Sequence, residues 1–186
     1  MTRALQAKQP VSAALAGPYG HPFHPMLVTV PIGAWAAALV FDIASRFADD
    51  PRFLSRAAMW LIALGVIGAL CAAMVGFLDL LAIPAGTRAF RVGLLHMTLN
   101  LLVTAAYVGN FLWRHAGVGP TGAVPAGQLA LNAATFVVLG VSGWLGGKLS
   151  YRYGVRVADE ETQAEGFRQD GGADPGPGPR SDRHSA

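Results

Sequence analysis

Cysteine and charge are both scarce in this sequence, and each shortage excludes a class of protein. The single cysteine, Cys71, leaves no intrachain disulfide, no cysteine-based zinc site and no Cys-x-x-Cys-His attachment site for haem. Charged residues make up 13% of the chain, about half of their share in a typical soluble domain. The sequence also has no Gly-x-Ser-x-Gly, His-Glu-x-x-His or phosphate-binding loop motif, so an enzyme is the less favoured class.

In place of these features the sequence has four apolar stretches of about 20 residues or more, the length that crosses a bilayer. Hydrocarbon offers backbone N–H and C=O groups no partner, so such segments must be helices. The sequence therefore predicts an integral membrane protein whose main partner is the lipid bilayer. The predicted helices are Pro25–Phe47, Ser55–Ile83, Thr87–Arg114 and Ala126–Lys148.

Connections that contain Gly and Pro separate these helices, and they are short compared with the helices. Short connections favour antiparallel neighbours, so the predicted fold is an all-α, four-helix transmembrane bundle with up-down-up-down topology. We expect residues 1–20 to form an N-terminal cytoplasmic segment and residues 21–157 to form the transmembrane domain. Residues 158–186 are acidic and rich in Gly and Pro, and this tail is expected to be disordered because it has little apolar surface to bury.

Lysine and arginine near the predicted helix ends are divided unevenly between the two sides of the membrane. Seven lie on the side of the two termini, and four lie on the other side, namely Arg46, Arg52, Arg56 and Arg114. Cytoplasmic segments carry the excess of Lys and Arg, so this bias predicts that both termini are cytoplasmic. These positions also explain the pI of 9.4 without nucleic acid, which is not an expected partner.

Polar residues line one face of the third predicted helix and one face of the first. On the third helix they fall within an arc of about 120° and are His96, Asn100, Thr104, Tyr107 and Asn110. On the first helix, His24, Pro31, Trp35 and Asp42 fall within about 40° of one another. A polar stripe that faced lipid would be unfavourable, so both faces should point into the bundle and meet there.

Depth in the membrane narrows the candidate site to one leaflet. With a rise of about 1.5 Å per residue, one set of polar residues lies near a common depth. The set consists of His21, His24, Asp79, His96 and Asn100. Asp42 lies toward the opposite end of the first helix, where we expect it to pair with Arg46 one turn later or to reach interfacial water.

Several motifs in these segments resemble those of a known family. They are Gly20-His-Pro-Phe-His-Pro-Met-Leu-Val, Pro31-Ile-Gly, Gly76-Phe-Leu-Asp-Leu-Leu-Ala-Ile-Pro, His96 with Asn100, and Ser142-Gly-Trp-Leu-Gly-Gly-Lys-Leu followed by Tyr151-Arg-Tyr-Gly-Val. Between about His21 and Val157 the chain resembles the domain-of-unknown-function family 2231 (DUF2231), bacterial four-helix proteins of the inner membrane. The resemblance implies a bacterial inner-membrane location and no established activity.

A b-type haem is the sharpest functional interpretation of the polar cluster. Such a haem takes two axial ligands, usually imidazoles, from facing helices, and His96 with His24 or His21 could supply them. In this interpretation Asp79 and Asn100 hydrogen-bond the ligands or the propionates, and glycines of the second and fourth helices make room for the macrocycle. Arg88 and Arg91 would pair with the propionates, and electrons would pass to a redox partner protein.

Three alternatives without haem stay open. In the first, the histidines are structural and His96 hydrogen-bonds to Asp79 between helices. In the second, Asp79 and His96 relay protons or ions, although four helices without an evident sequence repeat are few for a transporter unless the chain forms a homo-oligomer. In the third, His21, His24, His96 and Asp79 bind a metal ion.

Overall fold

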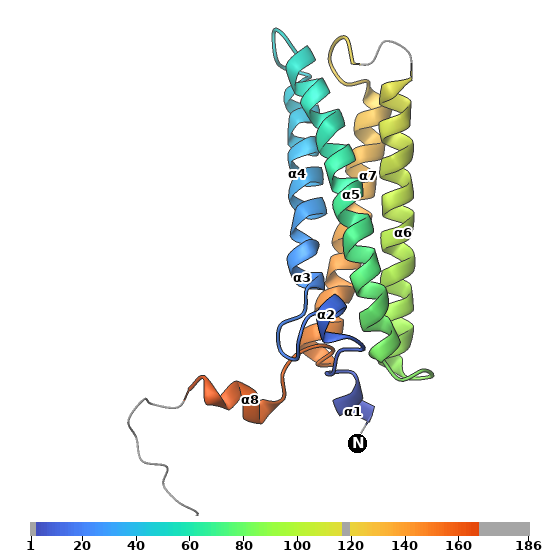
Figure 1. The fold of residues 1–186 in the computed structure, drawn as a ribbon. Coiled ribbons are helices and arrows are strands. Elements are labelled where there is room, and N and C mark those ends of the chain that lie inside the picture. The colour runs from blue at the N-terminus through green and yellow to red at the C-terminus, as the bar shows by residue number, and fades with distance from the viewer. Residues whose placement is uncertain (1–2, 117–119, 168–186) are drawn as a thin grey trace, which may run out of the picture.

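The computed structural model describes residues 3–116 and 120–167, and within these ranges the chain forms helices and no strands. Four helical segments are long. They stand side by side, and consecutive segments run in opposite directions (Figure 1). The predicted all-α, up-down-up-down bundle is therefore confirmed. The segments are α3 with α4 (His24–Leu27 and Thr29–Ala44), α5 (Arg52–Ala82), α6 (Arg88–His115) and α7 (Ala126–Gly147), which continues into the π-helical turn η1 (Lys148–Arg152).

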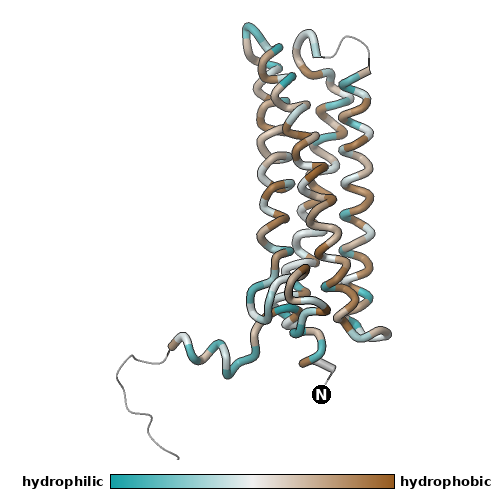
Figure 2. Tube along the Cα trace, viewed as in Figure 1, coloured by the Kyte–Doolittle hydropathy of each residue, from teal (hydrophilic) through white to brown (hydrophobic). Residues whose placement is uncertain are grey.

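The surface of the bundle is apolar and its interior is partly polar, the reverse of a soluble domain. All four segments are long and apolar enough to cross a membrane. Figure 2 shows hydrophobic residues along the helices and hydrophilic ones toward the ends of the bundle. Large apolar side chains such as Met74 and Val137 are 73% and 67% exposed, whereas Asp42 and Asn132 are fully buried. Lipid is the solvent that suits such a surface, and the chain is a multi-pass membrane protein.

The first membrane segment is interrupted at Val28, between α3 and α4. Pro31 has no backbone N–H, so the carbonyl of Leu27 lacks the hydrogen bond that a regular helix would give it. The Thr29 hydroxyl donates to the Met26 carbonyl at 2.7 Å beside this interruption. Together these features set His24 on a separate short helix at the entrance of the first segment.

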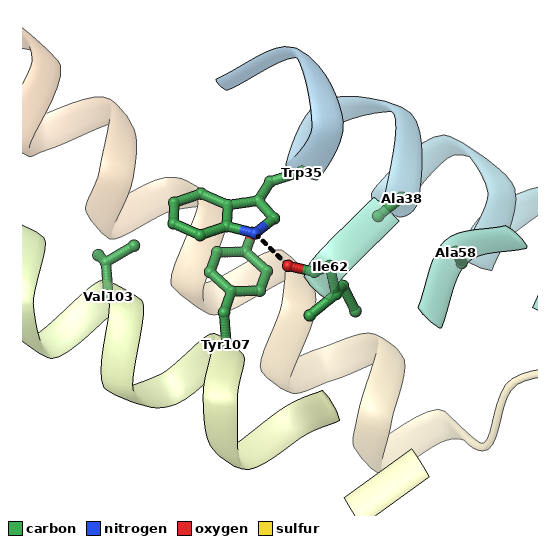
Figure 3. Packing of buried hydrophobic residues seen from close by; sticks show 6 residues of the cluster. All are labelled: Trp35, Ala38, Ala58, Ile62, Val103 and Tyr107. Carbon is green, nitrogen blue, oxygen red and sulfur yellow. Dashed lines mark hydrogen bonds between the residues drawn. The ribbon is translucent and has the colours of Figure 1, made fainter. Parts of the chain in front are cut away.

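Helix neighbours follow a closed ring around the bundle axis. α4 packs against α5 and α7, and α6 also packs against α5 and α7, so α4 and α6 face each other across the axis. Small residues on α5 permit the close approach of α4, because a Cβ at Gly68 would lie 2.7 Å from Val30 Cγ1. In the middle of the bundle, Trp35 of α4 stacks on Tyr107 of α6 with ring centroids 4.1 Å apart (Figure 3).

The N-terminal segment meets the residues that follow η1 at the end of the bundle where α3 and α6 begin, which we call the histidine end. The short helices α1 (Arg3–Gln6) and α2 (Ala13–Ala16) lie there, and Ala16 is fully buried. The opposite end is called the Asp42 end. Beyond the bundle, α8 (Glu160–Glu165) is a helical turn inside the tail predicted to be disordered, while residues 168–186 of that tail lie outside the described residues.

Candidate functional site

Three pairs of side chains meet along the bundle axis, each with one member on the first membrane segment and one on α6. At the histidine end the pair is His24 with His96, in the middle it is Trp35 with Tyr107, and at the other end Asp42 with Arg114. The residues of every pair are 72 positions apart in the sequence. The predicted meeting of the two polar faces is therefore confirmed, with Arg114 as a member that the sequence did not single out.

The first membrane segment contacts the next helix, α5, in the way that α6 contacts its own next helix, α7. His24 Nδ1 lies 2.9 Å from the Ala72 carbonyl, 48 residues on, and His96 Nδ1 lies 2.8 Å from the Ser142 carbonyl, 46 residues on. The Trp35 indole donates to the backbone of Ile62, 27 residues on, and the Tyr107 hydroxyl donates to the side chain of Asn132, 25 residues on.

These repeated contacts indicate that the bundle consists of two similar helical hairpins, α3–α5 and α6–α7, related by an approximate two-fold axis along the bundle. Parallel repeats of this kind occur in membrane transporters. The sequence shows no evident repeat because the paired residues differ in type: Trp pairs with Tyr, and Asp pairs with Arg. The repeat is preserved in the geometry of the contacts, with the second hairpin two residues shorter between equivalent partners.

The histidine pair lies on this axis and is held in matching ways from both sides. The two imidazole centroids are 6.3 Å apart, and the ring planes cross at 84°. Each imidazole reaches a helix carbonyl past a glycine four residues further along: Gly76 follows Ala72, and Gly146 follows Ser142. A Cβ at Gly76 would lie 2.8 Å from His24 Cε1, and one at Gly146 would lie 3.0 Å from His96 Cε1. These two glycines therefore make room for the imidazoles and not for a macrocycle.

The carbonyl contacts determine which nitrogen of each ring is available. A carbonyl oxygen only accepts hydrogen bonds, so Nδ1 of both rings is the donor, and Nε2 of a neutral imidazole then carries the lone pair. The amide Nδ2 of Asn100 lies against the same ring, 3.1 Å from Nε2 and 3.4 Å from Nδ1 of His96, and it donates to the His96 backbone carbonyl at 3.0 Å. The structure thus brings His24, His96 and Asn100 together, as predicted.

Two other predicted site residues lie apart from this pair. Asp79 forms an ion pair with Arg156, whose Nε is 2.8 Å from Asp79 Oδ1. Arg156 also donates to the carbonyls of Ala16 and Gly17 and so ties the N-terminal segment to the bundle. The expected hydrogen bond between His96 and Asp79 is therefore wrong, and a relay between them loses its direct contact. His21 is exposed and precedes α3.

The metal-ion interpretation also fails for the described residues. Over residues 3–116 and 120–167, no group of three or more His, Cys, Asp and Glu side chains is placed to hold a metal ion. Two imidazoles are the donor set that remains on the axis.

Asp42 is the centre of a second buried cluster, at the opposite end of the bundle. Arg114 donates to both carboxylate oxygens, at 2.7 and 2.6 Å, and Asn132 donates to Oδ2 at 2.6 Å. The predicted pairing of Asp42 with Arg46 is wrong, since Arg46 donates to the Val124 carbonyl instead. The sequence assigned Arg114 to the membrane interface; its position 72 residues after Asp42, shared with the other two pairs, is the signal that could have identified it.

Comparison with known proteins is consistent with this architecture. No curated protein and no solved structure matches the chain. A family model described as a predicted membrane protein (DUF2231) matches residues 20–159, which include both hairpins and the histidine pair. The chain therefore belongs to the DUF2231 family of predicted membrane proteins.

Proposed function

We propose that this membrane protein binds a b-type haem through His24 and His96 and transfers electrons within the membrane. The observation that carries the proposal is the pair of facing imidazoles, 6.3 Å apart, with Nδ1 of each on a backbone carbonyl. Membrane haems of this type usually take one imidazole on each face of the iron, from different helices.

The donor set fits such a group in its distance. With metal–nitrogen bonds of about 2 Å, two imidazoles on opposite sides of one iron have centroids about 6 Å apart. Donation of the other ring N–H to a backbone carbonyl is the usual arrangement of metal-ligating histidines, because it fixes the tautomer and the ring orientation. Both histidines have this arrangement, and the glycine beside each carbonyl is what permits it.

The remaining predicted residues divide into those that support the site and those that do not. Asn100 lies against the His96 ring, 3.1 Å from Nε2, and would contact this ligand or a haem propionate. Arg88 and Arg91 are exposed on the first turns of α6 and would pair with the haem propionates. Asp79 forms an ion pair with Arg156 and so does not hydrogen-bond to His24 or His96 in this proposal. A bound haem would supply a one-electron redox centre, while the backbone carbonyls of Ala72 and Ser142 orient the two imidazoles.

The proposal places the protein in the bacterial inner membrane with both termini in the cytoplasm. In that orientation the histidine end lies toward the cytoplasm, where a redox partner protein would exchange electrons with the haem. The excess of basic residues at this end supports the orientation.

A reduced-minus-oxidised visible spectrum of protein purified from haem-replete cells tests the proposal. We expect a Soret and an α band in the native protein, lost in both His24→Ala and His96→Ala. His115→Ala is the matched control, because His115 is an exposed imidazole at the far end of the same helix, and its bands should be unchanged. A folded but colourless native protein, or bands that survive both substitutions, would show that the histidines serve helix packing.

A further inference from the structure

A groove lies at the end of α7, and its lining includes neither histidine of the axial pair. Its volume is about 480 Å³, and it is lined by Trp144, Gly147, Lys148, Tyr151 and Arg152. Every lining residue comes from the last turn of α7 or from the π-helical turn η1. The groove therefore belongs to one helix terminus and does not depend on how the hairpins meet.

The π-helical turn is one of the features in which the two hairpins differ. In the first hairpin α5 continues as a regular α-helix to Ala82, whereas the second hairpin changes at Lys148 to a π-helical turn that continues to Arg152. Single π turns within α-helices are frequent at functional sites. The departure from symmetry coincides with the groove.

The groove combines two cations with exposed aromatic rings. Lys148 Nζ lies 5.5 Å from the centroid of Trp144 and 5.9 Å from that of Tyr153, so the two rings hold the ammonium group in place. Tyr151 is 93% exposed and Trp144 is 67% exposed. Among the described residues, the ion pairs involve Asp42, Asp50 and Asp79, and neither Lys148 nor Arg152 takes part in them.

We propose that this groove binds an anionic phospholipid, with the phosphate between Lys148 and Arg152 and the glycerol region against Trp144 and Tyr151. The apolar span of α7 and η1 ends at Arg152, so the groove lies where hydrocarbon gives way to lipid headgroups. Tryptophan and tyrosine favour this depth, and lysine and arginine attract anionic lipid there. This proposal is independent of haem binding.

The test measures lipid binding to the purified full-length chain by native mass spectrometry in detergent. Palmitoyl-oleoyl phosphatidylglycerol is the anionic probe, and the phosphatidylcholine with the same acyl chains is the neutral one. We expect the double variant Lys148→Gln/Arg152→Gln to bind the anionic lipid about 30-fold more weakly, roughly fivefold per charge. The native protein should bind the neutral lipid as weakly as this variant does.

Two further variants distinguish binding in the groove from a general effect of positive charge and from misfolding of the double variant. Arg88→Gln/Arg91→Gln removes two exposed cations at the same end of the bundle and should change the affinity less than twofold. Lys148→Arg/Arg152→Lys keeps both charges and should also retain binding. Equal binding of the two lipids, or an equal loss in the Arg88/Arg91 variant, would overturn the proposal.

Other occupants give different results. Displacement of the anionic lipid by inorganic phosphate alone would identify a site for free anions and would overturn a lipid site. A dimer that dissociates in the Lys148/Arg152 double variant, with lipid binding unchanged, would assign the groove to a second copy of the chain and would also overturn it.

Discussion

Removal of the cation from the Asp42 cluster should be among the most destabilising single changes in the bundle. The variant Arg114→Met keeps the length and apolar stem of the side chain while deleting the guanidinium group. Asp42 and Arg114 have side chains that are 0% and 1% exposed, so water cannot take over the lost contacts. Asn132 would be the one partner left from the present cluster on the buried carboxylate.

The expected loss has two parts. The substitution removes three hydrogen bonds, two to Asp42 and one to Asn110. Interhelical hydrogen bonds in membranes average about 0.6 kcal/mol, so these account for about 2 kcal/mol. Breaking one side of a buried ion pair costs 3–5 kcal/mol in total, that is about 1–3 kcal/mol more, because a charge is left without compensation.

Reversible unfolding in SDS, followed by far-ultraviolet circular dichroism, measures this loss as a change in unfolding free energy. The double variant Asp42→Asn/Arg114→Met removes both charges and should recover more than 1 kcal/mol of it. Arg46→Met is the matched control, since Arg46 makes a single hydrogen bond to the Val124 carbonyl, and it should cost less than about 1 kcal/mol. A loss below about 1 kcal/mol for Arg114→Met, or a double variant no more stable than the single one, would show that the Asp42 carboxylate does not depend on Arg114 for compensation.

Gly76→Ala places a Cβ 2.8 Å from the His24 ring and should lower the unfolding free energy by about 1–3 kcal/mol. Gly109→Ala is the control, because a Cβ there meets open space and should not lower it. Thermal unfolding of the two variants and the native protein compares them. Arg156→Met removes the donors to the Ala16 and Gly17 carbonyls and should speed limited proteolysis of the N-terminal segment several-fold, and unchanged cleavage would contradict this tie. The backbone N–H of Thr162 donates to the Asp159 carboxylate and lowers its pKa, so the N-cap of α8 is complete at neutral pH. The cap is lost as the pH falls through this lowered pKa, and NMR of the α8 amides should show that loss. The variant Asp159→Asn should remove the pH dependence.

The sequence predicted the features that are set within one helix, namely its length and its inward face. It did not predict which side chains from different helices contact each other. Apolar length alone identified the four spans, and a helical wheel identified the inward faces that carry His24, His96 and Asp42. A wheel gives the direction of a side chain but not the neighbour it meets, so Asp79 was matched to His96. Its actual partner, Arg156, follows the last membrane helix, in a segment whose return to the bundle leaves no periodic signal.

Arg114 was missed for a related reason. A lysine or arginine in the last turn of a membrane helix is ordinarily an interfacial residue that sets orientation. Arg114 is in that position on α6, yet its side chain points into the bundle. There Asp42 neutralises its charge, and Asn132 donates to the same carboxylate. The common spacing of the three axial pairs indicates that Arg114 pairs with Asp42. This spacing can be interpreted only after the structure shows that the two hairpins make the same contacts.

The equivalence of the hairpins makes a stringent prediction about this ion pair. Because Asp42 and Arg114 occupy corresponding positions, the exchanged variant Asp42→Arg/Arg114→Asp should form the same pair with its direction reversed. The surroundings are not fully symmetric. Asn110 corresponds to Ala38 and Asn132 to Ile62, so the exchanged pair lacks the two hydrogen bonds that these amides now make with it.

The exchanged variant should therefore recover most, but not all, of the stability lost in Asp42→Arg, which places two guanidinium groups together. Two missing hydrogen bonds should leave it about 1 kcal/mol less stable than the native protein, at about 0.6 kcal/mol each. The SDS unfolding free energies of the native protein, the single variant and the exchanged variant measure both differences. An exchanged variant as unstable as Asp42→Arg would show that the two positions are not interchangeable. In that case the common spacing of the pairs would not reflect a working two-fold repeat.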